Sequence, residues 1–134
     1  MTIYEFFRND RFAALAGVEL SDVRPGYARA TMTVTPDHLN AGGTVQGGAI
    51  FTLADLAFAA AVNAYGNLAV SIQSSIYFHR GLSSGVLAAE AKAIKVGASI
   101  ASFEATVTDE AGETVATFVA SAYRKDVTLP FAKP

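Results

Sequence analysis

The feature that most constrains the fold is an apolar segment in the middle of the chain, residues 48–65 (GAIFTLADLAFAAAVNAY). The segment contains no proline, and its many alanine and leucine residues favour a helix. Because apolar residues cover almost the whole circumference of that helix, the pattern indicates a helix buried on every side rather than one lying on a wet surface. The rest of the chain must then pack around this helix and cover its surface.

Strand patterns occupy most of the remaining sequence. Residues 18–35 read as extended chain, broken by a Pro-Gly turn signal at 25–26. After the helix, strands are predicted over residues 70–78, 87–94, 98–108 and 113–124, the last two joined by a hairpin turn. This order predicts an α+β fold, with an antiparallel sheet wrapped around one long central helix. The long open edges of such a sheet invite pairing with a second copy of the chain.

The length of 134 residues predicts one domain, residues 1–134. Within it, the capping-box spacing from Thr2 to Glu5 and the stop signal Gly17 predict a single N-terminal helix in residues 1–16. Residues 125–134 contain two prolines and are predicted to form a loose tail.

Composition and charge exclude several classes of function. Ten basic and twelve acidic residues give a net charge of −2 without a basic cluster, so nucleic acid is not an expected partner. The chain has no cysteine and only two histidines, which argues against disulfides and metal sites. Glycines break the low-charge stretch 39–78, and the N-terminus lacks the pattern of a leader peptide. We therefore expect a soluble cytoplasmic protein that does not cross a membrane.

One carboxylate stands out inside the apolar helix. Asp55 is the only charged residue between Asp37 and Arg80. A carboxylate in such surroundings must be hydrogen-bonded, protonated or directed at a cleft, because an unpaired buried charge is costly. It is either a structural residue bonded to a neighbour such as Thr52 or a catalytic group, and the residue alone favours neither interpretation.

Glycine and polar residues flank this helix on both sides. Gly47 and Gly48 precede it, so a ligand can approach bare N–H groups at the positive end of the helix, although a Gly-Gly pair is also typical of a plain loop. Asn40 lies in the same loop, where asparagine is usually a turn former. Ser71 and Gln73 are predicted on one face of the next strand, which either is wet or lines a cavity.

The spacing between the glycines and the acid limits how they can cooperate. Gly47 and Asp55 are eight residues apart on one helix, which is about 12 Å along its axis. Both must come within about 3 Å of a reacting carbonyl group to act on it. If the two residues serve one reaction they come from different chains, and the site lies at a two-fold interface.

The chain resembles the hot-dog-fold acyl-CoA thioesterases, in the phenylacetate-pathway (PaaI-like) branch. The loop and helix motif carries most of the resemblance, in the order Asn40, Gly42, Gly47, Gly48 and then Leu53-Ala54-Asp55. Further similarity lies in residues 69–72, 77–80 and 108–116. The resemblance implies a hot-dog fold, hydrolysis of acyl-CoA to a carboxylic acid and CoA, and no cofactor or metal, since CoA is part of the substrate.

The resemblance also implies roles for individual residues. Asp55 matches the catalytic carboxylate, which acts as nucleophile or as general base on water. Gly47 matches the residue whose N–H polarises the thioester carbonyl, Asn40 matches the asparagine that positions the nucleophile or water, and Ser71 matches a strand position that in some members holds the water. The family builds this site across a homodimer interface, and many members pair dimers into homotetramers.

Two departures from the family pattern concern substrate binding. Gln46 stands where the family often has histidine, and we expect it to line the substrate site with Gly48. The arginine that follows the glycine of a family strand motif is missing after Gly97. Arg80 and Lys95, together with Gly97, are therefore the predicted contacts of the CoA phosphates.

The sequence thus predicts an acyl-CoA thioesterase. The alternatives left open are a non-catalytic acyl-CoA-binding module or sensor of the same fold, a hydratase or dehydratase, and a purely structural dimerisation domain. A hydratase would need a histidine beside the helix, and a dimerisation domain would leave Asp55 and the glycine pair without a purpose.

Overall fold

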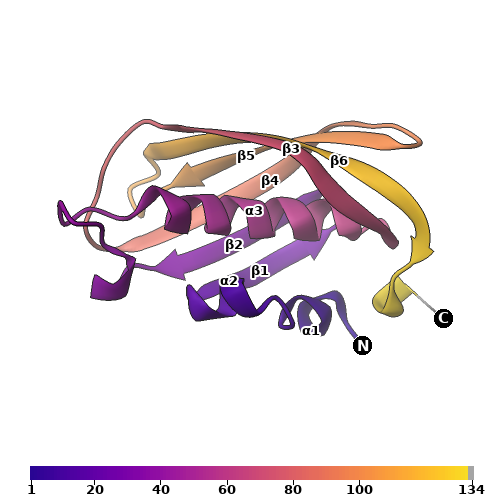
Figure 1. Ribbon diagram of the computed structural model, residues 1–134, viewed down its shortest axis with the longest axis horizontal. Coiled ribbons are helices and arrows are strands. Elements are labelled where there is room, and N and C mark those ends of the chain that lie inside the picture. Colours follow the sequence, from indigo (N-terminus) through magenta and orange to yellow (C-terminus); the bar gives the residue numbers. More distant parts are fainter. Residues whose placement is uncertain (133–134) are drawn as a thin grey trace.

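The computed structural model describes residues 1–132, and it confirms one long helix enclosed by one sheet (Figure 1). The central helix, α3, spans Gly47–Asn63, and ten of its 17 residues are buried. None of the helices within these described residues is long and apolar enough to span a bilayer.

The sheet has six antiparallel strands in the order β1-β2-β4-β5-β6-β3. Strand β3 follows α3 directly in sequence but lies at the far edge, beside β6, so β1 and β3 are the two open edges. The strands are β1 (Val18–Arg24), β2 (Tyr27–Thr33), β3 (Asn67–Phe78), β4 (Val86–Val96), β5 (Ile100–Thr108) and β6 (Thr114–Thr128). Each predicted strand is present, and the fold class is confirmed.

The side chains on the inner face of the sheet match the shape of helix α3. In β2 and β4, fully buried alanines lie opposite one another, Ala28 against Ala91 and Ala30 against Ala89, and these small side chains let α3 approach closely. Under β5 and β6 the space is filled by aromatic rings instead. Phe58 of α3 lies edge-on to Phe103 and tilted against Phe118, with ring centroids 5.7 and 6.0 Å apart.

A buried asparagine fixes the end of α3 relative to β3. The Asn63 amide donates to the Ala59 carbonyl at 2.8 Å, and its Oδ1 accepts from the Ala69 N–H at 2.9 Å. Asn63 is only 4% exposed, so these bonds are shielded from water. They hold the edge strand in a fixed position beside the helix.

The N-terminal region differs from the single helix predicted in residues 1–16. It forms two short helices, α1 (Ile3–Phe7) and α2 (Arg11–Leu15), which lie beside β1 and α3 (Figure 1). The capping box at Thr2 is confirmed, but Asp10 starts a second helix because its carboxylate accepts from the Ala13 N–H at 3.0 Å. Gly17 ends this region at φ +75°, as predicted.

The C-terminal region also differs from the loose tail predicted for residues 125–134. Strand β6 continues to Thr128, Leu129 is only 4% exposed, and a 3₁₀ turn, η2, covers Pro130–Ala132. The Leu129 N–H donates to the Gly66 carbonyl at 2.8 Å, and the Phe131 ring packs edge-on against Phe6. An apolar anchor therefore holds this segment, while residues 133–134 lie outside the described residues.

Candidate active site

Helix α3 leaves one stripe of its surface open instead of being buried all round. Gly48 is exposed, and Thr52, Asp55 and Ala59 are half-buried. Their spacing of four, three and four residues places them one above the other on the side away from the sheet. The predicted circumferential burial is therefore incomplete, and Asp55 lies on the open stripe.

The Asp55 carboxylate has no partner within residues 1–132. No hydrogen bond or ion pair to it is present there, and the Thr52 hydroxyl instead donates to the Gly48 carbonyl at 2.8 Å. Burial raises the pKa of Asp55 above its ordinary value, and the nearby negative charge of Asp10 raises this pKa further. The structure thus holds a destabilised carboxylate at the surface of the helix, without the Thr52 bond that a purely structural role would use.

The start of α3 presents a free backbone amide. Gln46 is the N-cap, and its Oε1 accepts from the Gly48 N–H at 2.5 Å. The Gly47 N–H has no acceptor among the described residues. This donor sits at the positive end of a 17-residue helix, where a developing negative charge is stabilised.

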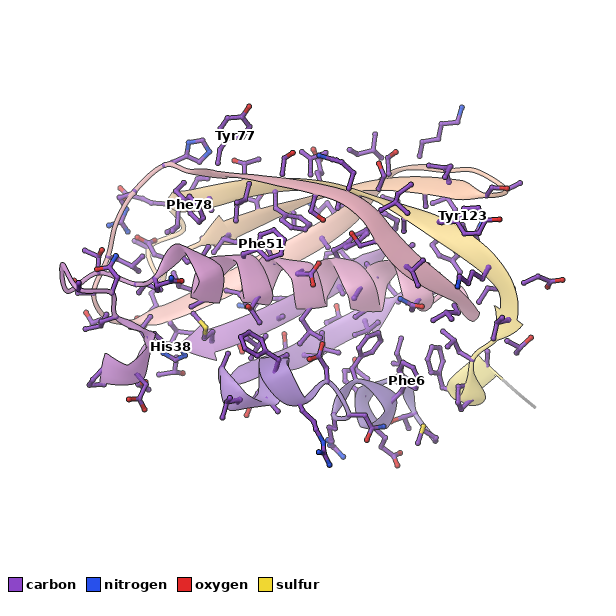
Figure 2. The ribbon with its side chains drawn as sticks, viewed as in Figure 1. Phe6, His38, Phe51, Tyr77, Phe78 and Tyr123 are labelled. Carbon is purple, nitrogen blue, oxygen red and sulfur yellow. The ribbon has the colours of Figure 1, made fainter. Side chains whose placement is uncertain are left out.

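A side chain at either glycine of this helix start would require a neighbouring side chain to move. A Cβ on Gly48 would lie 2.6 Å from the Gln46 Oε1, so a side chain would break the cap. A Cβ on Gly47 would lie 3.0 Å from the tip of the Phe78 ring of β3. Figure 2 shows Phe51 and Phe78 on the same side of this helix start. The sequence pattern did not indicate Phe78 as a site residue; its strand pairing with buried Ala116 directs it towards the helix.

Asn40 is engaged in its own loop. Its Oδ1 accepts from the Gly42 and Thr44 N–H groups at 2.9 and 3.2 Å, and its Nδ2 donates to the Thr44 hydroxyl at 3.1 Å. These bonds are those of a turn former. One of the two Nδ2 hydrogens remains without an acceptor among residues 1–132, and it is the part of the side chain left for a ligand.

A β-bulge changes which serines of β3 face the helix. Ser71 pairs with Ala122 and Ser74 with Ala120, and both alanines are buried on the inner face. The register shifts between Ser71 and Gln73, so Gln73 lies on the outer face opposite Ser121 rather than beside Ser71 as predicted. Simple alternation cannot reveal such an insertion.

The predicted phosphate contacts lie at opposite ends of the chain fold. Arg80 is near the start of α3, where it forms ion pairs with Asp109 and, at 3.6 Å, with Glu113. Lys95 lies near the end of β4, at the other end of the fold, and Gly97 follows this strand, where its carbonyl accepts from Arg124 Nη1 at 2.8 Å. One protomer therefore does not bring these residues together around Gly47.

One protomer also does not bring together the two central groups of the site, the Gly47 amide and the Asp55 carboxylate. Gly47 and Asp55 lie on one straight element, so about 12 Å of helix separates them. Gln46 and Gly48 flank the free amide and line a groove of about 950 Å³ that extends to Phe12 and Leu15 of α2. No group of three or more histidine, cysteine, aspartate or glutamate residues that could hold a metal occurs within residues 1–132.

A six-stranded antiparallel sheet wrapped around one long helix defines the hot-dog class of proteins. The Thioesterase superfamily matches residues 42–116, which include the helix start and Asp55. The chain belongs to this superfamily.

The chain is similar to other members of this superfamily in both sequence and structure. It is 33% identical over 122 residues to the acyl-coenzyme A thioesterase PaaI of Escherichia coli K12, covering 90% of this chain and 87% of that protein. It is 36% identical over 125 residues to a putative esterase of Archaeoglobus fulgidus, covering 92% and 81%. The solved structure of E. coli PaaI, from the phenylacetic acid degradation operon, superposes with a TM-score of 0.88 at 32% identity, covering 92% and 91%.

Proposed function

We propose that the protein hydrolyses acyl-CoA thioesters to a free carboxylic acid and CoA. The observation that carries this proposal is a pair of groups that find no partner within residues 1–132: the Asp55 carboxylate, which has no donor, and the helix-terminal Gly47 amide, which has no acceptor. The 33% identity to a protein named as an acyl-coenzyme A thioesterase supports the substrate class.

In the proposed reaction, the thioester carbonyl oxygen accepts a hydrogen bond from the Gly47 N–H. The Asp55 carboxylate removes a proton from water while the water oxygen bonds to the carbonyl carbon, and the negative charge moves to the carbonyl oxygen. The carbon–sulfur bond then breaks as the carbonyl re-forms, and the proton held by Asp55 passes to the departing CoA sulfur. In the alternative route, Asp55 attacks the carbon itself, the carbon–sulfur bond breaks and CoA leaves as a thiolate that takes a proton from water; water then cleaves the resulting anhydride to the free acid and regenerates the Asp55 carboxylate.

A homodimer with shared sites is part of the proposal. The helix separates Gly47 from Asp55 by about 12 Å, so each site takes its amide from one protomer and its carboxylate from the partner. Strand β3 is an open edge, with Ile72 57% and Phe78 52% exposed, and pairing along it would cover both side chains. Pairing of two such dimers would give the homotetramer that the family resemblance implies.

The remaining residues of the site support binding. Ser71 is proposed to hold the attacking water and Asn40 to contribute its free amide hydrogen, while Gln46 and Gly48 border the groove that receives the acyl group. Lys95 and Gly97 can contact CoA phosphates only from the partner protomer. Arg80 can contact a CoA phosphate only if it first gives up its ion pair with a carboxylate. Because acyl-CoA is an intracellular metabolite, the cytoplasm is the proposed location.

Thiol release from a panel of aromatic and aliphatic acyl-CoAs tests the function. We expect turnover by the wild-type protein and a loss of about 10²–10⁴-fold in kcat for Asp55→Asn, which keeps the shape of the side chain but is a poor base. Glu104→Gln, on the exposed outer face of β5, is the matched control and should keep full activity. Tight binding of acyl-CoA without turnover would instead identify a sensor of the same fold.

A further inference from the structure

The β-bulge in β3 brings a second serine, Ser74, onto the same face of the strand as Ser71, which simple alternation does not predict. The Ser71 and Ser74 hydroxyl oxygens lie 3.1 Å apart, within hydrogen-bonding distance. Both residues pair with alanines of β6 that are fully buried on the inner face, Ala122 and Ala120. Without the bulge, residues three apart on a strand would point to opposite faces and could not meet.

This contact restricts the side chain that the proposed mechanism uses. Ser71 is exposed on the open edge strand, and among residues 1–132 Ser74 is the only hydrogen-bond partner of its hydroxyl group. A free serine hydroxyl samples three staggered rotamers. The bond to Ser74 selects a single one, whichever of the two oxygens donates, and leaves the remaining capacity of Ser71 for a water molecule.

We propose that Ser74 is a positioning residue for the thioesterase reaction, which fixes the Ser71 hydroxyl in the orientation that holds the hydrolytic water. This inference rests on the proposed function, because it assigns Ser74 a task in the same site. Bulges occur preferentially next to active sites, where they re-aim a side chain. Here the re-aimed residue is Ser74, since the register is regular again from Gln73 to Phe78.

The neighbouring serine provides a matched control. Ser75 pairs with Val119 on the outer face and accepts a hydrogen bond from the Gln73 amide at 2.8 Å. Ser75→Ala thus removes a hydrogen-bonded hydroxyl from the same strand, one residue away, but on the face opposite the helix. A general weakening of β3 would affect both variants, whereas loss of the Ser71 orientation affects only Ser74→Ala.

The test is a double-mutant cycle measured by thiol release from the best substrate of the acyl-CoA panel. We expect Ser74→Ala to lower kcat about three- to tenfold with little change in KM, because the hydroxyl acts on the attacking water and not on substrate binding. Ser74→Thr, which keeps the hydroxyl and suits a strand, should restore most of the activity. Ser75→Ala should retain wild-type kcat.

The double-mutant cycle shows whether Ser74 acts by positioning Ser71 or acts independently of it. In a Ser71→Ala background, Ser74→Ala should cost no further activity, because the group it orients is already absent. An equal loss in both backgrounds, an unchanged kcat for Ser74→Ala, or an equal loss for Ser75→Ala would overturn the inference while leaving the hydrolase function in place. Absence of turnover by the wild-type protein on every acyl-CoA would overturn both.

Discussion

At the scale of single residues, the site consists of groups that folding leaves unsatisfied. The Gln46 side chain caps the second amide of α3, whereas the first one, on Gly47, has no acceptor among the residues that the structure describes. Asp55 is half-buried and has no partner in the described part of the chain, at a cost in stability that a structural role would have removed by supplying one. Unsatisfied groups of this kind are typical of sites that bind charge developing during a reaction.

The raised pKa of Asp55 predicts a pH-dependent gain in stability for Asp55→Asn. At low pH the carboxyl is protonated in both the folded and the unfolded state, so the substitution changes little. As the pH rises above the unfolded value of about 3.9, the unfolded state loses its proton more readily than the folded state, and wild-type stability falls. Thermal unfolding from pH 3 to pH 8 should therefore show Tm of Asp55→Asn rising relative to wild type and then levelling off. A constant difference would contradict the assigned cause.

The free amide of Gly47 can be deleted without removing the helix. Gly47 is the first helical residue, where proline is favoured, and Gln46 has the extended backbone (φ −64°, ψ 134°) that proline requires before it. Gly47→Pro should lower kcat about 10²–10³-fold, as expected for the loss of an oxyanion donor. Gly47→Ala is the steric control, because it makes the same contact with Phe78 but keeps the N–H group. Equal kcat values for the two variants would exclude the amide from the reaction.

At the scale of elements, regular patterns were predictable and local interruptions were not. The composition of residues 48–65 predicted α3, and alternation predicted the strands, because both depend on repeated burial of one face. The break between the two N-terminal helices at Asp10 and the β-bulge after Ser71 are local: the first depends on one side-chain cap, and the second on one shift of the strand register. The same limit applies to the site, where Asp55 and Gly47 stood out in the sequence but the pairs Phe78–Gly47 and Ser74–Ser71 required the register of β3.

Asp10 links the start of α2 to the electrostatics of Asp55, and two substitutions separate its roles. Asp10→Asn keeps an N-cap of similar quality but removes the charge that contributes to the raised pKa of Asp55. The acidic limb of the kcat/KM profile should then move to lower pH with little change in Tm. Asp10→Ala should shift the limb in the same direction and also destabilise the protein by about 1 kcal/mol. An unmoved limb in both variants would show that Asp10 does not act on Asp55 in the assembled enzyme.

At the scale of the whole molecule, the length of α3 determines how a site can be assembled. A rigid helix keeps Gly47 and Asp55 of one chain about 12 Å apart whatever the substrate does, and only a second chain can close that distance. The open edge at β3 is the surface that the fold offers for pairing. Subunit sharing is therefore a consequence of the fold and of the two residues, and it is testable without a structure of the dimer.

Mixing two inactive variants tests subunit sharing directly. In a heterodimer of Gly47→Pro and Asp55→Asn chains, one site carries both substitutions, while the other combines an intact amide with an intact carboxylate. Unfolding and refolding an equimolar mixture gives half heterodimers, so about one quarter of wild-type kcat should return, although each variant alone is nearly inactive. Sedimentation should show the same assembly for the variants, the mixture and the wild type. If the mixture stays as inactive as its components while assembling normally, both groups act from within one chain and the proposed geometry is wrong.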